Sequence, residues 1–279
     1  MPIAKLGDIE MYYEEKGSGE AVLLVPASWW PSDTWNVRVV PFLSQRFRTI
    51  IFDCRGTGRT SKTKDGYTVA QFAKDGIELV EYLGVNRCHV VGFALGGQIV
   101  QAMAIERSDL VATLSIAASG SGAKTLGGGQ RIVSPDTERE IHDRGFERYI
   151  RNYIENDSMA FHPVFYREHN DVVAALADAV WSGQSTVEMF RCHEDARLTW
   201  DTLAQAPRVK VPTLILCGAD DDVARRGSTP VGTARRLAEV TPGCELFLIP
   251  NTKHMTFWDG TGGVLALQDF LTRHPIHPS

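Results

Sequence analysis

Short, almost uninterrupted apolar runs alternate with helix-length segments along this chain of 279 residues. Such runs are typical of parallel strands that are buried on both faces of a sheet. The apolar runs are residues 21–25, 48–53, 89–92, 110–117, 213–218 and 246–250. The helix-length segments are residues 36–45, 69–83, 95–106, 233–240 and 263–273. Their alternation predicts a mostly parallel α/β sheet, which starts with a hairpin formed by residues 3–6 and 9–13.

The alternation stops in the middle of the chain. A glycine-rich stretch over residues 120–129 is followed by helical patterns without strand-like runs. Ser134 and Pro135 are typical of a helix start and predict one helix over about residues 136–155. We expect this helical insertion to form a cap over the carboxyl ends of the strands, with the glycines as a flexible hinge. The predicted division is a core of residues 1–122 and 208–279 and a helical cap, or lid, of residues 123–207.

Charge and cysteine usage exclude several classes of partner. The net charge is −5 and the basic residues are scattered, which argues against nucleic acid or an anionic membrane. The five cysteines have no C-x-x-C spacing. Three of them, Cys88, Cys217 and Cys244, lie in or beside apolar runs, which favours buried thiols in a reducing compartment. No apolar targeting segment or membrane-length run occurs, which predicts a cytoplasmic protein. The oligomeric state stays open, and a homodimer is compatible with the sequence.

The segment Gly92-Phe93-Ala94-Leu95-Gly96 follows one apolar run directly and opens a helical pattern. Its glycines have the spacing of the nucleophile elbow G-x-S-x-G, a sharp turn between a strand and a helix. The central residue of that turn has a strained backbone, so the residues two before and two after it must be very small. Ala94 occupies the central position, where the pattern has a serine.

Three further motifs follow later or earlier strand-like runs. They are Gly218-Ala219-Asp220-Asp221-Asp222-Val223, Pro250-Asn251-Thr252-Lys253-His254 and Asp53-Cys54-Arg55-Gly56-Thr57-Gly58-Arg59-Thr60. Together with the elbow they resemble the α/β-hydrolase superfamily, in its motif order and over nearly the whole chain. The resemblance implies the α/β-hydrolase fold, with an eight-stranded, mostly parallel sheet flanked by helices and a helical cap inserted after the sixth strand.

The resemblance also implies the roles of the residues in these motifs. Position 94 is that of the nucleophilic serine, His254 is the general base, and Asp221 falls on the acid position of the family's G-x-x-D pattern. Asp259, five residues after His254, stands where the family often has a carboxylate. One oxyanion donor is the Leu95 N–H. The second is assigned to the Ser28 N–H, because Pro26-Ala27 replaces the usual His-Gly pair; this departure leaves the assignment open by one residue.

Several residues on loops and cap segments that are expected to face the pocket are candidates for substrate contact. Most are apolar or aromatic, and ordinary core packing is the alternative interpretation for each. The candidates are Trp29, Trp30, Trp181, Phe190, Arg191, His193 and Met255. The row of Asp220, Asp221 and Asp222 lacks the spacing of a metal-binding loop, so no metal is expected.

Within the superfamily, residues 66–97 look most like 3-oxoadipate enol-lactonases and neighbouring lactone and ester hydrolases. This resemblance implies hydrolysis of a small-molecule ester or lactone through an acyl-serine intermediate, without a cofactor. Hydrolases of C–C bonds in ring-cleavage products and cofactor-free haloperoxidases share the elbow. An arginine in the cap that binds a carboxylate, for which Arg191 is the candidate, would favour a C–C hydrolase.

An alanine cannot act as the nucleophile, which leaves two interpretations of Ala94. In the first, the chain is an inactivated enzyme whose serine has been replaced. In the second, it is a natural non-catalytic member that binds a small ligand as a receptor. We favour the first, because the elbow glycines, Asp221 and His254 all fit the catalytic pattern.

Overall fold

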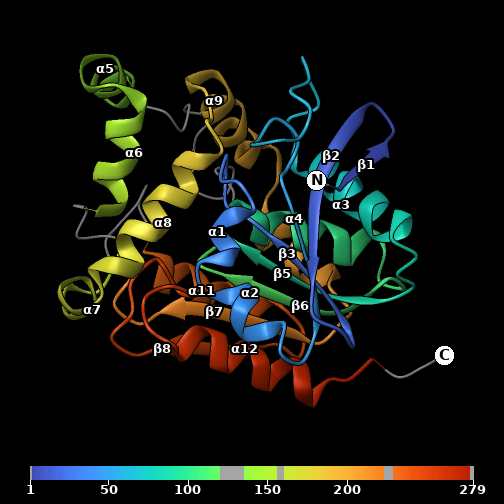
Figure 1. Ribbon diagram of the computed structural model, residues 1–279. Coiled ribbons are helices and arrows are strands. Elements are labelled where there is room, and N and C mark those ends of the chain that lie inside the picture. Colours follow the sequence, from blue (N-terminus) through green and yellow to red (C-terminus); the bar gives the residue numbers. More distant parts are fainter. Residues whose placement is uncertain (1, 120–134, 156–159, 223–228, 277–279) are drawn as a thin grey trace.

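The computed structural model describes residues 2–119, 135–155, 160–222 and 229–276. One eight-stranded sheet, in the order β1-β2-β4-β3-β5-β6-β7-β8, forms the centre (Figure 1). The strands are β1 (Ile3–Leu6), β2 (Ile9–Lys16), β3 (Ala21–Val25), β4 (Arg48–Phe52), β5 (Cys88–Phe93), β6 (Val111–Ala117), β7 (Thr213–Gly218) and β8 (Glu245–Ile249). Strand β2 pairs antiparallel with β1 and β4. The neighbouring strands in the rest of the sheet, β4-β3-β5-β6-β7-β8, pair in parallel. The predicted α/β-hydrolase fold, with its helical insertion after β6, is confirmed.

Helices cover both faces of this sheet. They are α1 (Asp33–Asn36), α2 (Val39–Leu43), α3 (Val69–Tyr82), α4 (Leu95–Glu106), α10 (Thr202–Gln205), α11 (Pro230–Val240) and α12 (Gly262–Arg273). Apolar residues of α3, α4 and α11 share one buried cluster with the sheet, and those of α1, α2 and α12 share a second cluster on the other face. The parallel strands β3 to β7 are therefore buried on both sides, as their continuous apolar runs predict. The edge strand β8 differs, because it is only partly buried and its Phe247 is 42% exposed.

Two residues determine the ends of α3. The Thr68 hydroxyl accepts a hydrogen bond from the Gln71 N–H at 3.1 Å and so caps the start of α3. Gly84, with φ of +65°, ends the same helix. The predicted helix over residues 36–45 is instead the two short helices α1 and α2, with Arg38 in a non-helical conformation between them.

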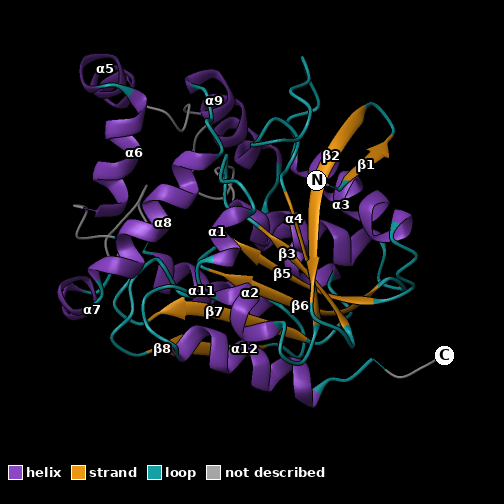
Figure 2. Cartoon of the chain, in the orientation of Figure 1, coloured by secondary structure: helices purple, strands orange, loops and turns teal. Residues whose placement is uncertain are grey.

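The insertion after β6 is built from helices in the part that the structure describes (Figure 2). These helices are α5 (Pro135–Arg144), α6 (Phe146–Glu155), α7 (Pro163–Glu168), α8 (Asn170–Ser182) and α9 (Val187–Ala196). The single helix expected over residues 136–155 is wrong, because Gly145 has φ of +84° and separates α5 from α6. The predicted hinge at residues 120–129 and the predicted cap residue Ser134 lie outside the described residues.

No helix within the described ranges has the length and apolar character that crossing a membrane requires.

Candidate active site

The elbow lies between β5 and α4, where Ala94 has φ of 52° and ψ of −112°. Its N–H donates to the Ala117 carbonyl at 3.0 Å, and its carbonyl accepts from the Gly97 N–H at 3.1 Å. A non-glycine residue holds such a conformation only where its surroundings impose it. The turn that the glycine spacing predicts is therefore present with alanine at its centre.

The elbow glycines are required by close backbone contacts. A Cβ atom on Gly92 would lie 2.1 Å from the Gly96 carbonyl oxygen, and one on Gly96 would lie 2.2 Å from the Val25 carbonyl oxygen. No side chain fits either position without moving the backbone. The two glycines let β5, the start of α4 and the end of β3 meet at one point.

His254 and Asp221 come together from the loops after β8 and β7. The His254 Nδ1 and the Asp221 Oδ2 are 2.9 Å apart, and the Asp221 side chain is 1% exposed. Asp220, by contrast, is half exposed and lies 3.8 Å from His162. Asp221 is thus the member of the aspartate row that can orient the imidazole and stabilise its protonated form.

Asp259 joins the histidine loop to the insertion. Its buried carboxylate accepts the N–H of Lys253 at 2.7 Å and the N–H of His162 at 2.8 Å. Burial raises the pKa of Asp259, while the two N–H donors lower it. The residue therefore fixes the backbone next to His254 against the start of α7.

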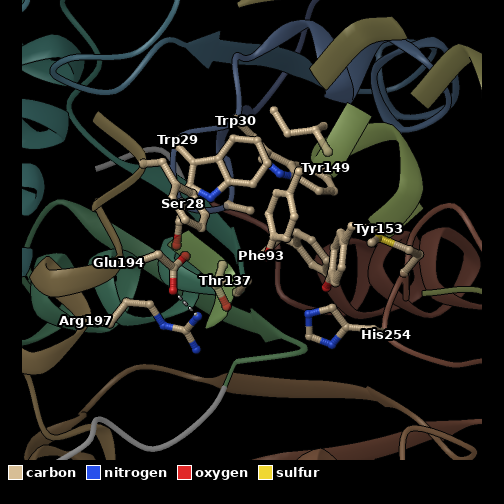
Figure 3. Close-up of a pocket in the computed structure, with 15 residues that line it drawn as sticks. Ser28, Trp29, Trp30, Phe93, Thr137, Tyr149, Tyr153, Glu194, Arg197 and His254 are labelled. Carbon is tan, nitrogen blue, oxygen red and sulfur yellow. Dashed lines mark hydrogen bonds and ion pairs between the residues drawn. The ribbon is translucent and has the colours of Figure 1, made fainter. Parts of the chain in front are cut away.

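A cavity of about 200 Å³ lies over the elbow, between the sheet and the insertion (Figure 3). Its lining comes from the loop after β3, the elbow, the histidine loop, and helices α5, α6 and α9. The lining residues are Ala27, Ser28, Trp29, Trp30, Phe93, Ala94, Thr137, Tyr149, Ile150, Tyr153, Phe190, Glu194, Arg197, His254 and Met255. A small cavity of this kind, lined mostly by apolar residues that include six aromatic ones, suits a small molecule.

Most of the predicted contact residues line this cavity, but three described ones do not. Trp181 lines a separate surface hollow near Phe146. Arg191 is 46% exposed and pairs with Glu138 at 3.0 Å. His193 is 1% exposed and lies under the loop after β3, where it bonds to the backbone. Leu95 and Asp221 lie behind the lining, with buried side chains.

A charged pair in the cavity wall, Glu194 and Arg197, is absent from the site residues that the sequence predicts. Arg197 Nη1 lies 3.2 Å from Glu194 Oε2, on the other side of the cavity from His254 in Figure 3. Phe190, Glu194 and Arg197 are spaced i, i+4, i+7 and so share one face of α9 and its continuation. Counted from Phe190, this spacing is the sequence signal that places Arg197 on the same helical face as Phe190. Arg191 lies on another face.

The chain is similar in sequence and fold to known proteins. The sequence model of the alpha/beta hydrolase family matches residues 22–267. The chain is 29% identical to the bifunctional esterase/perhydrolase DCH of Acinetobacter calcoaceticus, over 77% of this chain and 80% of that protein. It is 26% identical to BpoC of Mycobacterium tuberculosis H37Rv, which carries the name of a non-heme bromoperoxidase, over 90% and 93%. The crystal structure of the enol-lactonase from Burkholderia xenovorans LB400 superposes with a TM-score of 0.80 at 22% identity, covering 97% of this chain and 100% of that one.

Proposed function

Because this chain belongs to the α/β hydrolase family, we propose that it is built as a serine-type hydrolase of small esters or lactones, in which Ala94 has replaced the nucleophile. The observation that carries the proposal is the position of the elbow and the His254–Asp221 pair at one cavity. The relatives named for esterase and enol-lactonase activity support the same bond class.

With a serine at position 94, the reaction would follow from the residues already described. The serine oxygen attacks the carbonyl carbon while His254 takes its proton, and Asp221 stabilises the resulting imidazolium. The Leu95 N–H, at the start of α4, and the Ser28 N–H would bind the oxyanion. His254 then returns the proton to the leaving alcohol and activates water to release the acid.

The chain with Ala94 has no oxygen to attack the substrate, so we interpret it as an inactivated form. The buried Asp221, its bond to His254 and the glycine contacts of the elbow support this interpretation. A natural receptor is the other hypothesis, and it predicts ligand binding without turnover.

A C–C bond hydrolase is a second candidate, because an arginine from the insertion does reach the cavity. That arginine is Arg197, whose side chain is 31% exposed and pairs with Glu194. Its guanidinium could form a bidentate ion pair with a carboxylate of the substrate. A substrate with a carboxylate and a diketo group would then be cleaved in place of a neutral ester.

The test is the Ala94→Ser protein, assayed with neutral esters, lactones and a diketo acid. We expect kcat to rise by about 10⁶-fold over the Ala94 protein on at least one ester or lactone, the scale known for a triad that acts as a unit. The same change combined with His254→Ala is the matched control and should remain at the Ala94 level. Cleavage of the diketo acid alone would favour the C–C hydrolase. No gain on any substrate would contradict the proposal and favour the receptor.

A further inference from the structure

Helix α9 places a buried histidine directly under the loop that follows β3. His193 is 1% exposed, and its Nδ1 lies 2.9 Å from the Trp29 nitrogen. Its Nε2 lies 2.8 Å from the Arg55 carbonyl oxygen. The ring packs 5.0 Å from the ring of Phe72 and 5.8 Å from that of Tyr67. Both ring nitrogens are thus engaged by backbone groups of the core.

These two partners determine the protonation of the ring. The Trp29 N–H can only donate, so the His193 Nδ1 must accept and carries no proton. The Arg55 carbonyl can only accept, so the Nε2 must carry the proton. Burial lowers the pKa of His193 to about 4, which agrees with a neutral imidazole in this place.

A second side chain from the insertion holds the same loop residue. The Ser185 hydroxyl donates to the Trp29 carbonyl at 2.8 Å. Trp29 itself has φ of 52°, in the left-handed region that non-glycine residues rarely adopt. The insertion therefore binds both the N–H and the carbonyl of Trp29, and these contacts hold the residue in a conformation that its own preferences oppose.

We propose that His193 is a positioning residue of the oxyanion hole. By accepting the Trp29 N–H, it removes that donor from the cavity and fixes the peptide that joins Ser28 to Trp29. Because the Trp29 N–H is engaged by His193, the loop presents the Ser28 N–H to the substrate at the cavity lining. The insertion is thus a part of the oxyanion hole as well as a cover. The catalytic side of this inference rests on the proposed function.

The two nitrogens of His193 can be tested separately. The side chain of Asn can place its oxygen near the Nδ1 position and keep the bond to Trp29, whereas that of Gln reaches the Nε2 position and keeps only the bond to Arg55. In the Ala94→Ser background, we expect His193→Gln to lower kcat about 10- to 100-fold, below the loss of about 10²- to 10³-fold for a deleted oxyanion donor. His193→Asn should restore most of that loss, and KM should change little in either. Equal kcat losses in both variants would mean a purely structural role and overturn the proposal.

Hydrogen exchange of the Trp29 amide in the Ala94 protein gives a readout that needs no activity. With the parent, His193→Asn and His193→Gln proteins labelled with ¹⁵N-tryptophan, we expect protection of Trp29 to survive in the Asn variant and to fall at least tenfold in the Gln variant. Unchanged protection in the Gln variant would show that His193 does not hold this amide. If Ala94→Ser is inactive on all substrates, the proposed function fails, and the exchange pattern alone decides whether His193 positions the loop.

Discussion

The buried His193 should make the fold sensitive to mild acid. In the folded protein its pKa is about 4, because burial disfavours the charged imidazolium and the Arg55 carbonyl offsets this only in part. In the unfolded chain the pKa returns to about 6.5. Acid therefore protonates the unfolded chain first, so the stability linked to His193 is complete above about pH 6.5 and is lost as the pH falls toward about 4. From these two values the loss between about pH 7 and about pH 5 is ~2 kcal/mol.

The measurement is urea unfolding of the parent and of His193→Asn at about pH 7 and about pH 5, with the free energy extrapolated to water. The Asn side chain keeps an acceptor for the Trp29 N–H but does not titrate. The pH change should therefore cost the parent ~2 kcal/mol more than the variant. Comparing the two removes other acid-sensitive groups, among them His89, whose pKa is also lowered by burial.

A second variant tests whether the removal of any histidine changes the acid sensitivity of the fold. His142 is 87% exposed, so His142→Asn should keep the full acid loss of the parent. If the parent and His193→Asn lose the same free energy between the two pH values, His193 is not a buried neutral base and the argument from its contacts is refuted.

Three further predictions concern packing, charge and thiols. Gly96→Ala should lower the free energy of unfolding by ~3 kcal/mol or prevent folding, because the new Cβ would lie 2.2 Å from a carbonyl oxygen. Gly84→Ala, whose Cβ would have no atom within 4 Å, should lower it by only ~1 kcal/mol because of the positive φ. Thermal unfolding of the two variants measures the difference. Asp75→Asn should destabilise the fold by ~3 kcal/mol, because it leaves the buried Arg55 without its buried partner. Asp8→Asn removes an exposed carboxylate from the same arginine and should destabilise the fold by less than ~1 kcal/mol. Similar losses for both variants in urea unfolding would contradict this prediction. At neutral pH a thiol reagent should modify three buried thiols only as fast as the protein unfolds. Burial raises the pKa of each thiol and also blocks the reagent. Rapid modification of any of the three in the folded protein would contradict this prediction. These thiols are Cys54, Cys88 and Cys217.

The parts of the site that the sequence predicts are those with a local signal. Gly92 and Gly96 flank position 94 at fixed spacing, and the structure gives the reason in backbone contacts that no side chain allows. Asp221 follows the buried strand β7 and His254 follows the edge strand β8, each within a few residues. Because parallel strands end at the same edge of the sheet, their separation in the sequence does not matter, and the two side chains meet at 2.9 Å.

The parts that the sequence could not give depend on how the insertion is placed over the sheet. Arg191 and Arg197 lie on the same helical segment, and their spacing from Phe190 puts them on different faces. Which of these faces lines the cavity depends on how α9 docks over the sheet. His193 was expected to contact the substrate because cap helices face the pocket. Its face of α9 points to Trp29 and Arg55 instead, through hydrogen bonds across more than a hundred residues of chain. Tertiary contacts of this range leave no periodic trace in the sequence.

The strain at Ala94 argues that the surrounding backbone, and not residue 94 itself, builds the elbow. Alanine has no side-chain group that could stabilise φ of 52° with ψ of −112°, and such a sparsely populated conformation costs about 1–3 kcal/mol. The turn is held by the hydrogen bond from the Ala94 N–H to the Ala117 carbonyl and by the bond that the Gly97 N–H donates to the Ala94 carbonyl. The tight backbone contacts of Gly92 and Gly96 hold it as well. A serine has the same backbone preferences, so Ala94→Ser adds one oxygen to a frame that is already formed. A gain of activity in that protein would therefore report the chemistry of the added oxygen, since no rearrangement of the turn is needed to place it.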